Sequence, residues 1–158
     1  MYVYYGSATG LGSVGWTASG QYAGDAFGSA VGTAGDVNRD GYDDLIIGAG
    51  GYPDGGAYGK VYLYLGGAGG LATAASWVAS GPSAGARFGG AVATAGDVNA
   101  DGYGDVIIGA PLRNQVYVYH GGPDGLEQGA EAWARTQQAV EVGSQFGYTV
   151  GTAGDVNG

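Results

Sequence analysis

A segment of about sixty residues recurs along this chain, and the repeat limits the folds open to it. It is marked by Phe-Gly pairs and by acidic stretches that open on Asp, each recurring at spacings of 61 and 58 residues. Self-similarity at a fixed period of this size is typical of repeat architectures, in which each unit buries an apolar face against its neighbours. The markers are Phe27, Phe88 and Phe146, followed by Asp36, Asp97 and Asp155.

Each unit contains four short stretches that are typical of β-strands. In the first complete unit we expect strands over 27–35, 44–49 and 60–65, and a fourth that carries Trp77. In the second unit the strands should cover 88–96, 105–110 and 115–120, with the fourth carrying Trp133. The third strand alternates Val or Leu with Tyr and is apolar on both faces, so both faces of its sheet should be covered.

The sequence therefore predicts an all-β fold, a partial β-propeller built of four-stranded antiparallel blades stacked face to face. We expect strands three and four of a preceding blade over 1–26, complete repeats over 27–87 and 88–145, and a first strand with a truncated loop over 146–158. Because propellers have four to eight blades, we expect the chain to be a piece of a longer protein. The alternative is a chain that completes its ring by oligomerising.

The acidic stretches have the spacing of a cation-binding loop. Side-chain oxygens fall at positions 1, 3, 5 and 9 and Gly at position 6, while position 7 offers a backbone carbonyl. Ca²⁺ takes six to eight oxygen ligands at roughly 2.3–2.6 Å, and a tight loop can aim alternate side chains at one point. The candidate ligands are Asp36, Asn38, Asp40, Tyr42 and Asp44 in the first loop, and Asp97, Asn99, Asp101, Tyr103 and Asp105 in the second.

Two other interpretations of these loops remain. Asp, Asn and Gly are ordinary turn residues, so the loops could be Asx turns without a cation. An EF-hand loop opens in the same way but needs flanking helices and Glu at position 12, where this chain has Ile47 and Ile108. The third copy, at Asp155, lacks positions 5 and 9, so we expect two Ca²⁺ sites and not three.

Charge and composition exclude several classes of function. The net charge is −9, and two bound Ca²⁺ ions would bring it to −5. The five Lys and Arg residues are scattered, which argues against a nucleic-acid surface. The chain has no Cys, no apolar run long enough to span a membrane, and no recognisable catalytic set or secretion signal. The single histidine, His120, is expected at the surface or in a turn and not as a catalytic base.

The combined order of motifs resembles the FG-GAP repeats of the integrin α-subunit propeller. The resemblance rests on the Phe-Gly pairs, the Asp-X-Asn-X-Asp-Gly-X-X-Asp loops and Gly109-Ala110-Pro111, although the first unit has Gly48-Ala49-Gly50 instead. It implies that the acidic loop joins strands one and two and holds a structural Ca²⁺. It also implies that a protein or carbohydrate partner docks on the opposite rim, where the exposed candidates are Tyr22, Tyr52, Arg113 and Asn114.

We therefore expect an extracellular or cell-surface interaction or adhesion module and not an enzyme. Other blades, of this chain or another, are further expected partners. An alternative is an accessory propeller of a secreted phospholipase or polysaccharide-degrading enzyme whose catalytic domain lies outside this segment.

Overall fold

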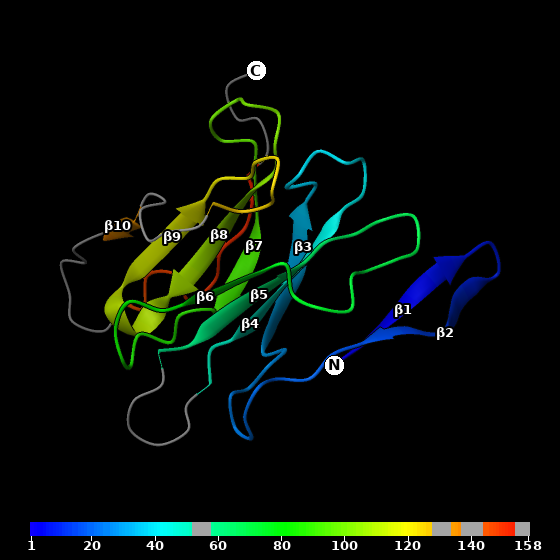
Figure 1. Ribbon diagram of the computed structural model, residues 1–158. Helices are drawn as coiled ribbons and strands as arrows, with labels where there is room; N and C mark the ends of the chain where they lie inside the picture. Colours follow the sequence, from blue (N-terminus) through cyan, green and yellow to red (C-terminus); the bar gives the residue numbers. More distant parts are fainter. Residues whose placement is uncertain (52–57, 128–133, 137–143, 154–158) are drawn as a thin grey trace.

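The computed structural model describes residues 1–51, 58–127, 134–136 and 144–153, and within these residues it contains β-strands and one short 3₁₀-helix but no α-helix. The strands form three antiparallel sheets, of two, four and four strands (Figure 1). This arrangement confirms the predicted all-β fold of partial propeller blades. The elements are β1 (Tyr2–Ser7), β2 (Gly10–Thr17), β3 (Ala30–Gly35), β4 (Asp44–Ala49), β5 (Lys60–Tyr64), β6 (Trp77–Ser80), β7 (Ala91–Gly96), β8 (Asp105–Ala110), η1 (Pro111–Arg113), β9 (Gln115–Tyr119) and β10 (Ala134–Thr136).

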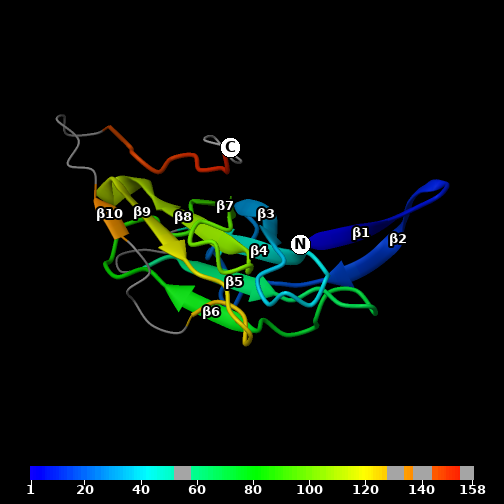
Figure 2. The same cartoon turned by 90° about the horizontal axis from the view of Figure 1, so that it is seen from above.

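Each sheet follows the chain in simple up-and-down order. The first sheet is the β1–β2 hairpin, the second has the order β3-β4-β5-β6, and the third has the order β10-β9-β8-β7. Seen from above in Figure 2, the two four-stranded sheets stack side by side and the hairpin extends away at one end. No helix within the described residues is long and apolar enough to cross a membrane.

The apolar core lies between the sheets and divides into two clusters. Neighbouring residues of β4 point to opposite faces, so Ile46 joins the cluster between the two four-stranded sheets, whereas Ile47 joins the cluster beneath the hairpin. In β5, Leu63 and Tyr64 divide between the same two clusters. Both faces of the central sheet are therefore covered, as the apolar pattern of its strands requires.

Aromatic rings connect each sheet to the segment that precedes it. Two tyrosines in the third strand of each four-stranded sheet receive an indole and a phenyl ring edge-on. Centroids 4.7–5.3 Å apart and interplanar angles of 70–77° are favourable for aromatic pairs. The pairs are Trp16–Tyr64 and Phe27–Tyr62 in one sheet, and Trp77–Tyr119 and Phe88–Tyr117 in the next.

The indole nitrogens of two tryptophans also hold the next connection in place. Nε1 of Trp16 donates to the carbonyl oxygen of Ala72 at 2.8 Å, and Nε1 of Trp77 donates to that of Glu127 at 3.1 Å. Trp133, the third tryptophan, lies outside the described residues. Trp16 and Trp77 are thus packing residues, each with its indole nitrogen satisfied by a hydrogen bond.

The predicted first strands begin too early, because the Phe-Gly pairs are turns and not strands. β3 begins at Ala30 and β7 at Ala91, three residues after Phe27 and Phe88. Ala26 and Gly28 have positive φ angles of 53° and 85°, which a strand does not allow. The turn carries a backbone hydrogen bond of 3.0 Å from Gly28 N to the carbonyl oxygen of Gly48.

A glycine in the second strand of each sheet allows the backbones of successive units to touch. A Cβ built at Gly48 would lie 2.0 Å from the carbonyl oxygen of Gly89, and one at Gly109 would lie 2.0 Å from that of Gly147. Gly48 and Gly109, which open Gly48-Ala49-Gly50 and Gly109-Ala110-Pro111, are therefore required by the close packing between units.

Candidate metal centre

The two complete acidic loops lie at the same end of the molecule, which we call the acidic edge. The loop 36–44 joins β3 to β4, and the loop 97–105 joins β7 to β8. Gly41 and Gly102 have positive φ angles of 90° and 89°, as the tight turn was predicted to need. Position 4 of each loop, two residues before the glycine, also has a left-handed backbone, with φ angles of 59° at Arg39 and 60° at Ala100. The residue types at this position did not indicate that conformation.

Inside the first loop, side-chain oxygens at positions 1, 3 and 5 gather around one short stretch of backbone. The carboxylate of Asp36 accepts hydrogen bonds from Asp40 N at 3.0 Å and Gly41 N at 2.8 Å. Oδ1 of Asn38 accepts from Asp40 N at 3.2 Å, and its Nδ2 donates to Asp40 Oδ2 at 2.9 Å. Asp40 Oδ1 in turn accepts from Tyr42 N at 3.0 Å.

The second loop repeats this hydrogen-bond network. Asp97 accepts from Asp101 N at 3.1 Å and from Gly102 N at 2.9 Å. Oδ1 of Asn99 accepts from Asp101 N at 3.2 Å, and Nδ2 of Asn99 donates to Asp101 Oδ2 at 2.8 Å. Asp101 Oδ1 accepts from Tyr103 N at 2.9 Å. The same geometry thus forms twice from loops that differ in sequence at positions 4 and 8.

The carboxylate at position 9 has a different environment. Asp44 is only 2% exposed, and its two oxygens accept hydrogen bonds from Val37 N and Gly66 N, both at 2.8 Å. Asp105 is fully buried and accepts from Val98 N at 2.7 Å and Gly121 N at 2.9 Å. Each of these carboxylates joins the acidic loop to the end of the sheet's third strand, a structural role that sequence reasoning did not assign.

Electrostatics within the first loop favour a cation. Burial is the largest cause that raises the pKa of Asp44 above its ordinary value of 3.8, although two backbone hydrogen bonds act in the opposite direction. The negative charges of Asp40 and Asp36 raise that pKa further. In the second loop, the hydrogen bond from Tyr103 N is the largest cause that lowers the pKa of the exposed Asp101.

The residues of the loops fit a hard divalent cation by their chemistry. Carboxylate, amide and carbonyl oxygens are the ligands of Ca²⁺, and a carboxylate oxygen that accepts one N–H keeps a further lone pair. Within the described residues, however, no three His, Cys, Asp or Glu side chains are arranged as a ligand set. The reason is local, because the carboxylates face backbone N–H groups in the manner of Asx turns.

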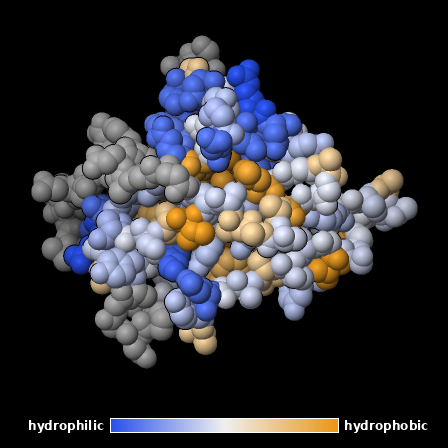
Figure 3. All heavy atoms as spheres, viewed as in Figure 1, coloured by the Kyte–Doolittle hydropathy of each residue, from blue (hydrophilic) through white to orange (hydrophobic). Residues whose placement is uncertain are grey.

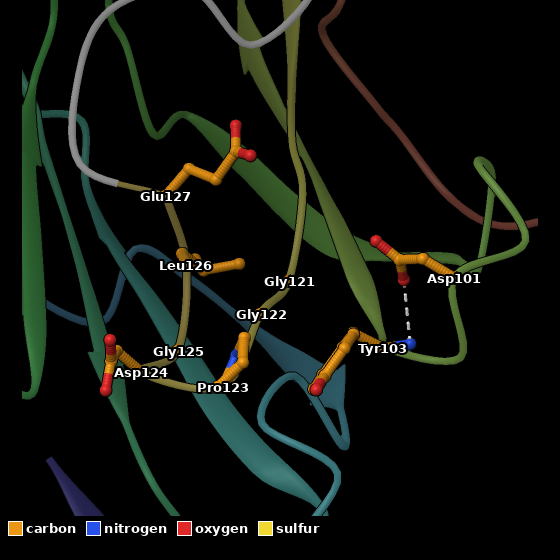
Figure 4. Close-up of a pocket in the computed structure, with 9 residues that line it drawn as sticks. All are labelled: Asp101, Tyr103, Gly121, Gly122, Pro123, Asp124, Gly125, Leu126 and Glu127. Atoms are coloured by element: carbon orange, nitrogen blue, oxygen red, sulfur yellow. Dashed lines mark hydrogen bonds between the residues drawn. The ribbon is translucent and has the colours of Figure 1, made fainter.

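Three polar residues near the second loop have surroundings that sequence reasoning did not predict. Nδ1 of His120 lies 3.3 Å from Asp105 Oδ1 without hydrogen-bond geometry, and its side chain is 28% exposed. Asp124 and Glu127 line a hollow of about 460 Å³ together with Asp101 and Tyr103 (Figure 4). The signal for these residues was weak, because they belong to a connection whose length differs between the repeats.

Most carboxylates of the described residues gather at one end of the sheets, where Arg39 of the first acidic loop also lies. Hydrophilic residues gather at the end where the acidic loops lie (Figure 3). Within the described chain, every Asp and Glu except Asp25 belongs to the acidic loops or to the adjoining hollow. The connections at the other end, which we call the opposite edge, carry Lys60, Arg87 and Arg113.

Three of the four partner-binding candidates lie on this opposite edge. Tyr22 is 64% exposed, and Nζ of Lys60 lies 5.8 Å from the centroid of its ring. Arg113 donates through Nη2 to the carbonyl oxygen of Ala84 at 3.3 Å. Asn114 has a left-handed conformation and accepts from Ser144 Oγ at 3.1 Å. Tyr52 and the truncated third loop at Asp155 lie outside the described residues.

Comparison with known proteins yields matches over most of the chain. The model of the FG-GAP repeat matches residues 27–64 and 88–120, which cover the first three strands of each four-stranded sheet. Integrin alpha-PS2 of Drosophila melanogaster is 39% identical over 150 residues, which are 85% of this chain and 10% of that protein.

Two further relatives give similar figures. Integrin alpha pat-2 of Caenorhabditis elegans is 36% identical over 165 residues, covering 90% of this chain and 13% of that protein. Integrin alpha-3 of Mus musculus is 35% identical over 147 residues, covering 87% of this chain and 14% of that protein. The chain thus spans only 10–14% of the length of these relatives.

Proposed function

The chain belongs to the FG-GAP repeat proteins and is related to integrin α subunits, and from this premise we propose that it is a calcium-stabilised interaction module of the adhesion type that works outside the cell. The observation that carries the proposal is the twofold recurrence of one loop geometry. Two loops with different residues at positions 4 and 8 place the oxygens of positions 1, 3 and 5 around the same turn.

In the proposed first site, Asp36, Asn38, Asp40 and Asp44 supply side-chain oxygens and Tyr42 its carbonyl oxygen. In the second site, Asp97, Asn99, Asp101 and Asp105 supply side-chain oxygens and Tyr103 its carbonyl oxygen. The ion would neutralise the negative charges of Asp36 and Asp40, which raise the pKa of Asp44. Its role is structural, because each loop connects the first two strands of a sheet.

Low affinity fits an extracellular role. Calcium sites of extracellular modules bind at about 10⁻⁴–10⁻³ M. Such sites fill where Ca²⁺ is abundant, outside the cell. The partner is then a protein or carbohydrate that docks on the opposite edge, with Tyr22, Tyr52, Arg113 and Asn114 as candidate contacts, and the scaffold repeats are residues 27–87 and 88–145.

Thermal unfolding in calcium against EGTA tests the proposal. With Ca²⁺ at about ten times the dissociation constant, each site adds roughly 1.4 kcal/mol to the free energy of unfolding. Two sites add about 3 kcal/mol, which for a chain of this size raises Tm by about 6–12 °C. The double variant Asp40→Ala, Asp101→Ala should lose this increment, and each single variant should lose about half.

The matched control is Asp43→Ala. Asp43 is exposed, stands in the same loop and carries the same charge, but it occupies position 8 and makes none of the loop's side-chain hydrogen bonds. Its removal should leave the calcium increment intact. Equal unfolding temperatures in calcium and EGTA, or an increment that survives the double variant, would refute the metal sites.

A further inference from the structure

The two complete acidic loops are in direct backbone contact with each other. Gly104 N of the second loop donates to the carbonyl oxygen of Asp36, the first residue of the first loop, at 2.8 Å. The connection that follows β9 adds a second hydrogen bond, from Gly122 N to the carbonyl oxygen of Val37 at 3.0 Å. The first loop is therefore held against the second, and a side chain that leaves the first loop on this side meets its neighbour.

The side chain of Arg39 leaves the first loop and lies against the second. A Cβ built at Gly102 would be 2.9 Å from Nη1 and 3.2 Å from Cζ of Arg39, so the guanidinium group packs on the glycine at position 6 of the second loop. The second loop has Ala100 at the position of Arg39, with nearly the same φ angle and no charge. The guanidinium group is therefore a feature of the contact between the loops and not of the repeated loop itself.

The positive charge of Arg39 acts on the second loop without being neutralised there. Among the described residues, no carboxylate forms an ion pair with Arg39. The hydrogen bond from Tyr103 N is the largest cause that lowers the pKa of Asp101, and the charges of His120 and Arg39 lower it further. The causes that shift the pKa of Asp44, in the first loop, do not include Arg39. A positive charge beside a carboxylate favours its ionised form but repels a metal ion that binds to it.

We propose that Arg39 of the first loop sets the calcium affinity of the second loop by holding a positive charge against it. The proposal rests on the calcium sites proposed above and names a residue that regulates one of them. Arg39 is not a ligand, and it acts on the ion through its charge alone. Its guanidinium group weakens binding, so the second loop fills at a higher calcium concentration than its own ligands would require.

The exposure of Arg39 limits the size of this effect and makes it depend on salt. Water and dissolved ions weaken interactions between exposed charges, so removal of the guanidinium charge should raise the calcium affinity of the second loop by about two- to fivefold at low ionic strength. In 1 M salt the Debye length falls to about 3 Å, and the difference should nearly vanish. An effect of Arg39 on the shape of the loop would not depend on salt in this way.

A calcium titration followed by heteronuclear NMR measures each loop separately in the intact chain. The amide of Gly41 reports on the first loop and that of Gly102 on the second, because these amides donate to Asp36 and Asp97. In Arg39→Gln the calcium concentration at half-saturation should fall about two- to fivefold for Gly102 and should change less for Gly41. Arg39→Lys keeps the charge and should stay close to the wild type, whereas Arg39→Glu should lower the Gly102 midpoint further.

The matched control is Arg113→Gln. Arg113 is also exposed and carries the same charge, but it belongs to the opposite edge. Its replacement changes the net charge of the chain by the same amount as Arg39→Gln. Both calcium midpoints should therefore stay at their wild-type values, which separates the local charge at the second loop from the charge of the whole molecule.

Three results with a chain that binds calcium would overturn the proposal. They are a Gly102 midpoint that does not move in Arg39→Gln, an equal shift at Gly41 and Gly102, and a lysine variant of Arg39 that behaves like the glutamine variant. If neither amide responds to calcium in the wild-type chain, the calcium sites themselves are refuted and the role of Arg39 with them. That outcome differs from calcium binding in both loops without an effect of Arg39, which refutes only the present proposal.

Discussion

Replacing Asp44 by Ala removes a buried carboxylate that holds two segments together. Its oxygens accept from Val37 N in the acidic loop and from Gly66 N after β5, both at 2.8 Å. Alanine leaves both backbone donors without this acceptor, at a position that is only 2% exposed. The loss should therefore destabilise the chain even when no calcium is present.

The expected magnitude follows from these two contacts. A hydrogen bond to a charged group contributes about 1.5–3 kcal/mol, so two of them contribute roughly 3–6 kcal/mol. Burial opposes this gain, because the same desolvation that raises the pKa of Asp44 disfavours its ionised form. We therefore expect a loss near the lower limit, about 3 kcal/mol, or a fall in Tm of about 6–12 °C.

The assay is urea or thermal unfolding in EGTA at neutral pH, followed by tryptophan fluorescence. Asp43→Ala is the control, because it removes an equal charge from the neighbouring residue, whose side chain is exposed. It should change the free energy of unfolding by less than about 0.5 kcal/mol. If Asp43→Ala and Asp44→Ala unfold alike, the carboxylate at position 9 does not act as the structural link described above.

Other predictions concern packing and proton competition. Gly48→Ala should cost about 1–3 kcal/mol, occasionally more, because its Cβ would lie 2.0 Å from the Gly89 carbonyl oxygen, whereas Gly69→Ala meets nothing within 4 Å and should be nearly neutral in urea unfolding. Trp77→Ala should cost about 3–5 kcal/mol in the same assay, since it empties a buried site and frees the Glu127 carbonyl. Calcium affinity measured by calorimetry should weaken on acidification, beginning above pH 3.8. The reason is that Asp44 has a raised pKa and must lose its proton to bind the ion. A calcium affinity that stays constant down to pH 3.8 contradicts the role of Asp44 as a ligand.

Sequence reasoning succeeded where a strand is a continuous apolar run. The second strands, 44–49 and 105–110, begin and end at the predicted residues because an acidic loop precedes each run and turn residues or Pro111 follow it. It failed at the Phe-Gly turns. The left-handed residues there are Ala26, Arg87 and Gln145, three residue types with no shared preference for that conformation. The backbone contact between successive units determines the conformation of this turn, and a local sequence pattern does not indicate that contact.

The acidic loops show the same limit at the level of single atoms. Spacing indicates which positions carry oxygens, and the structure brings Asp36, Asn38 and Asp40 together as expected. Spacing does not indicate what each oxygen faces. The donors to Asp44 and Asp105 include Gly66 N and Gly121 N, which are 22 and 16 residues away in the sequence. The contact between His120 and Asp105 depends on the same long-range pairing of strands.

Among the residues that the structure describes, the charges of the two edges differ and form an electric dipole along the strands. The negative end is the acidic edge, although Arg39 lies there too, and the opposite edge carries Lys60, Arg87 and Arg113 together with Asp25. Near a negatively charged surface the molecule experiences a torque that turns the opposite edge toward that surface, over a range of about 8 Å at physiological ionic strength. Each bound divalent cation at the acidic edge weakens this torque, so calcium would govern how firmly the molecule is oriented as well as how stably it is folded.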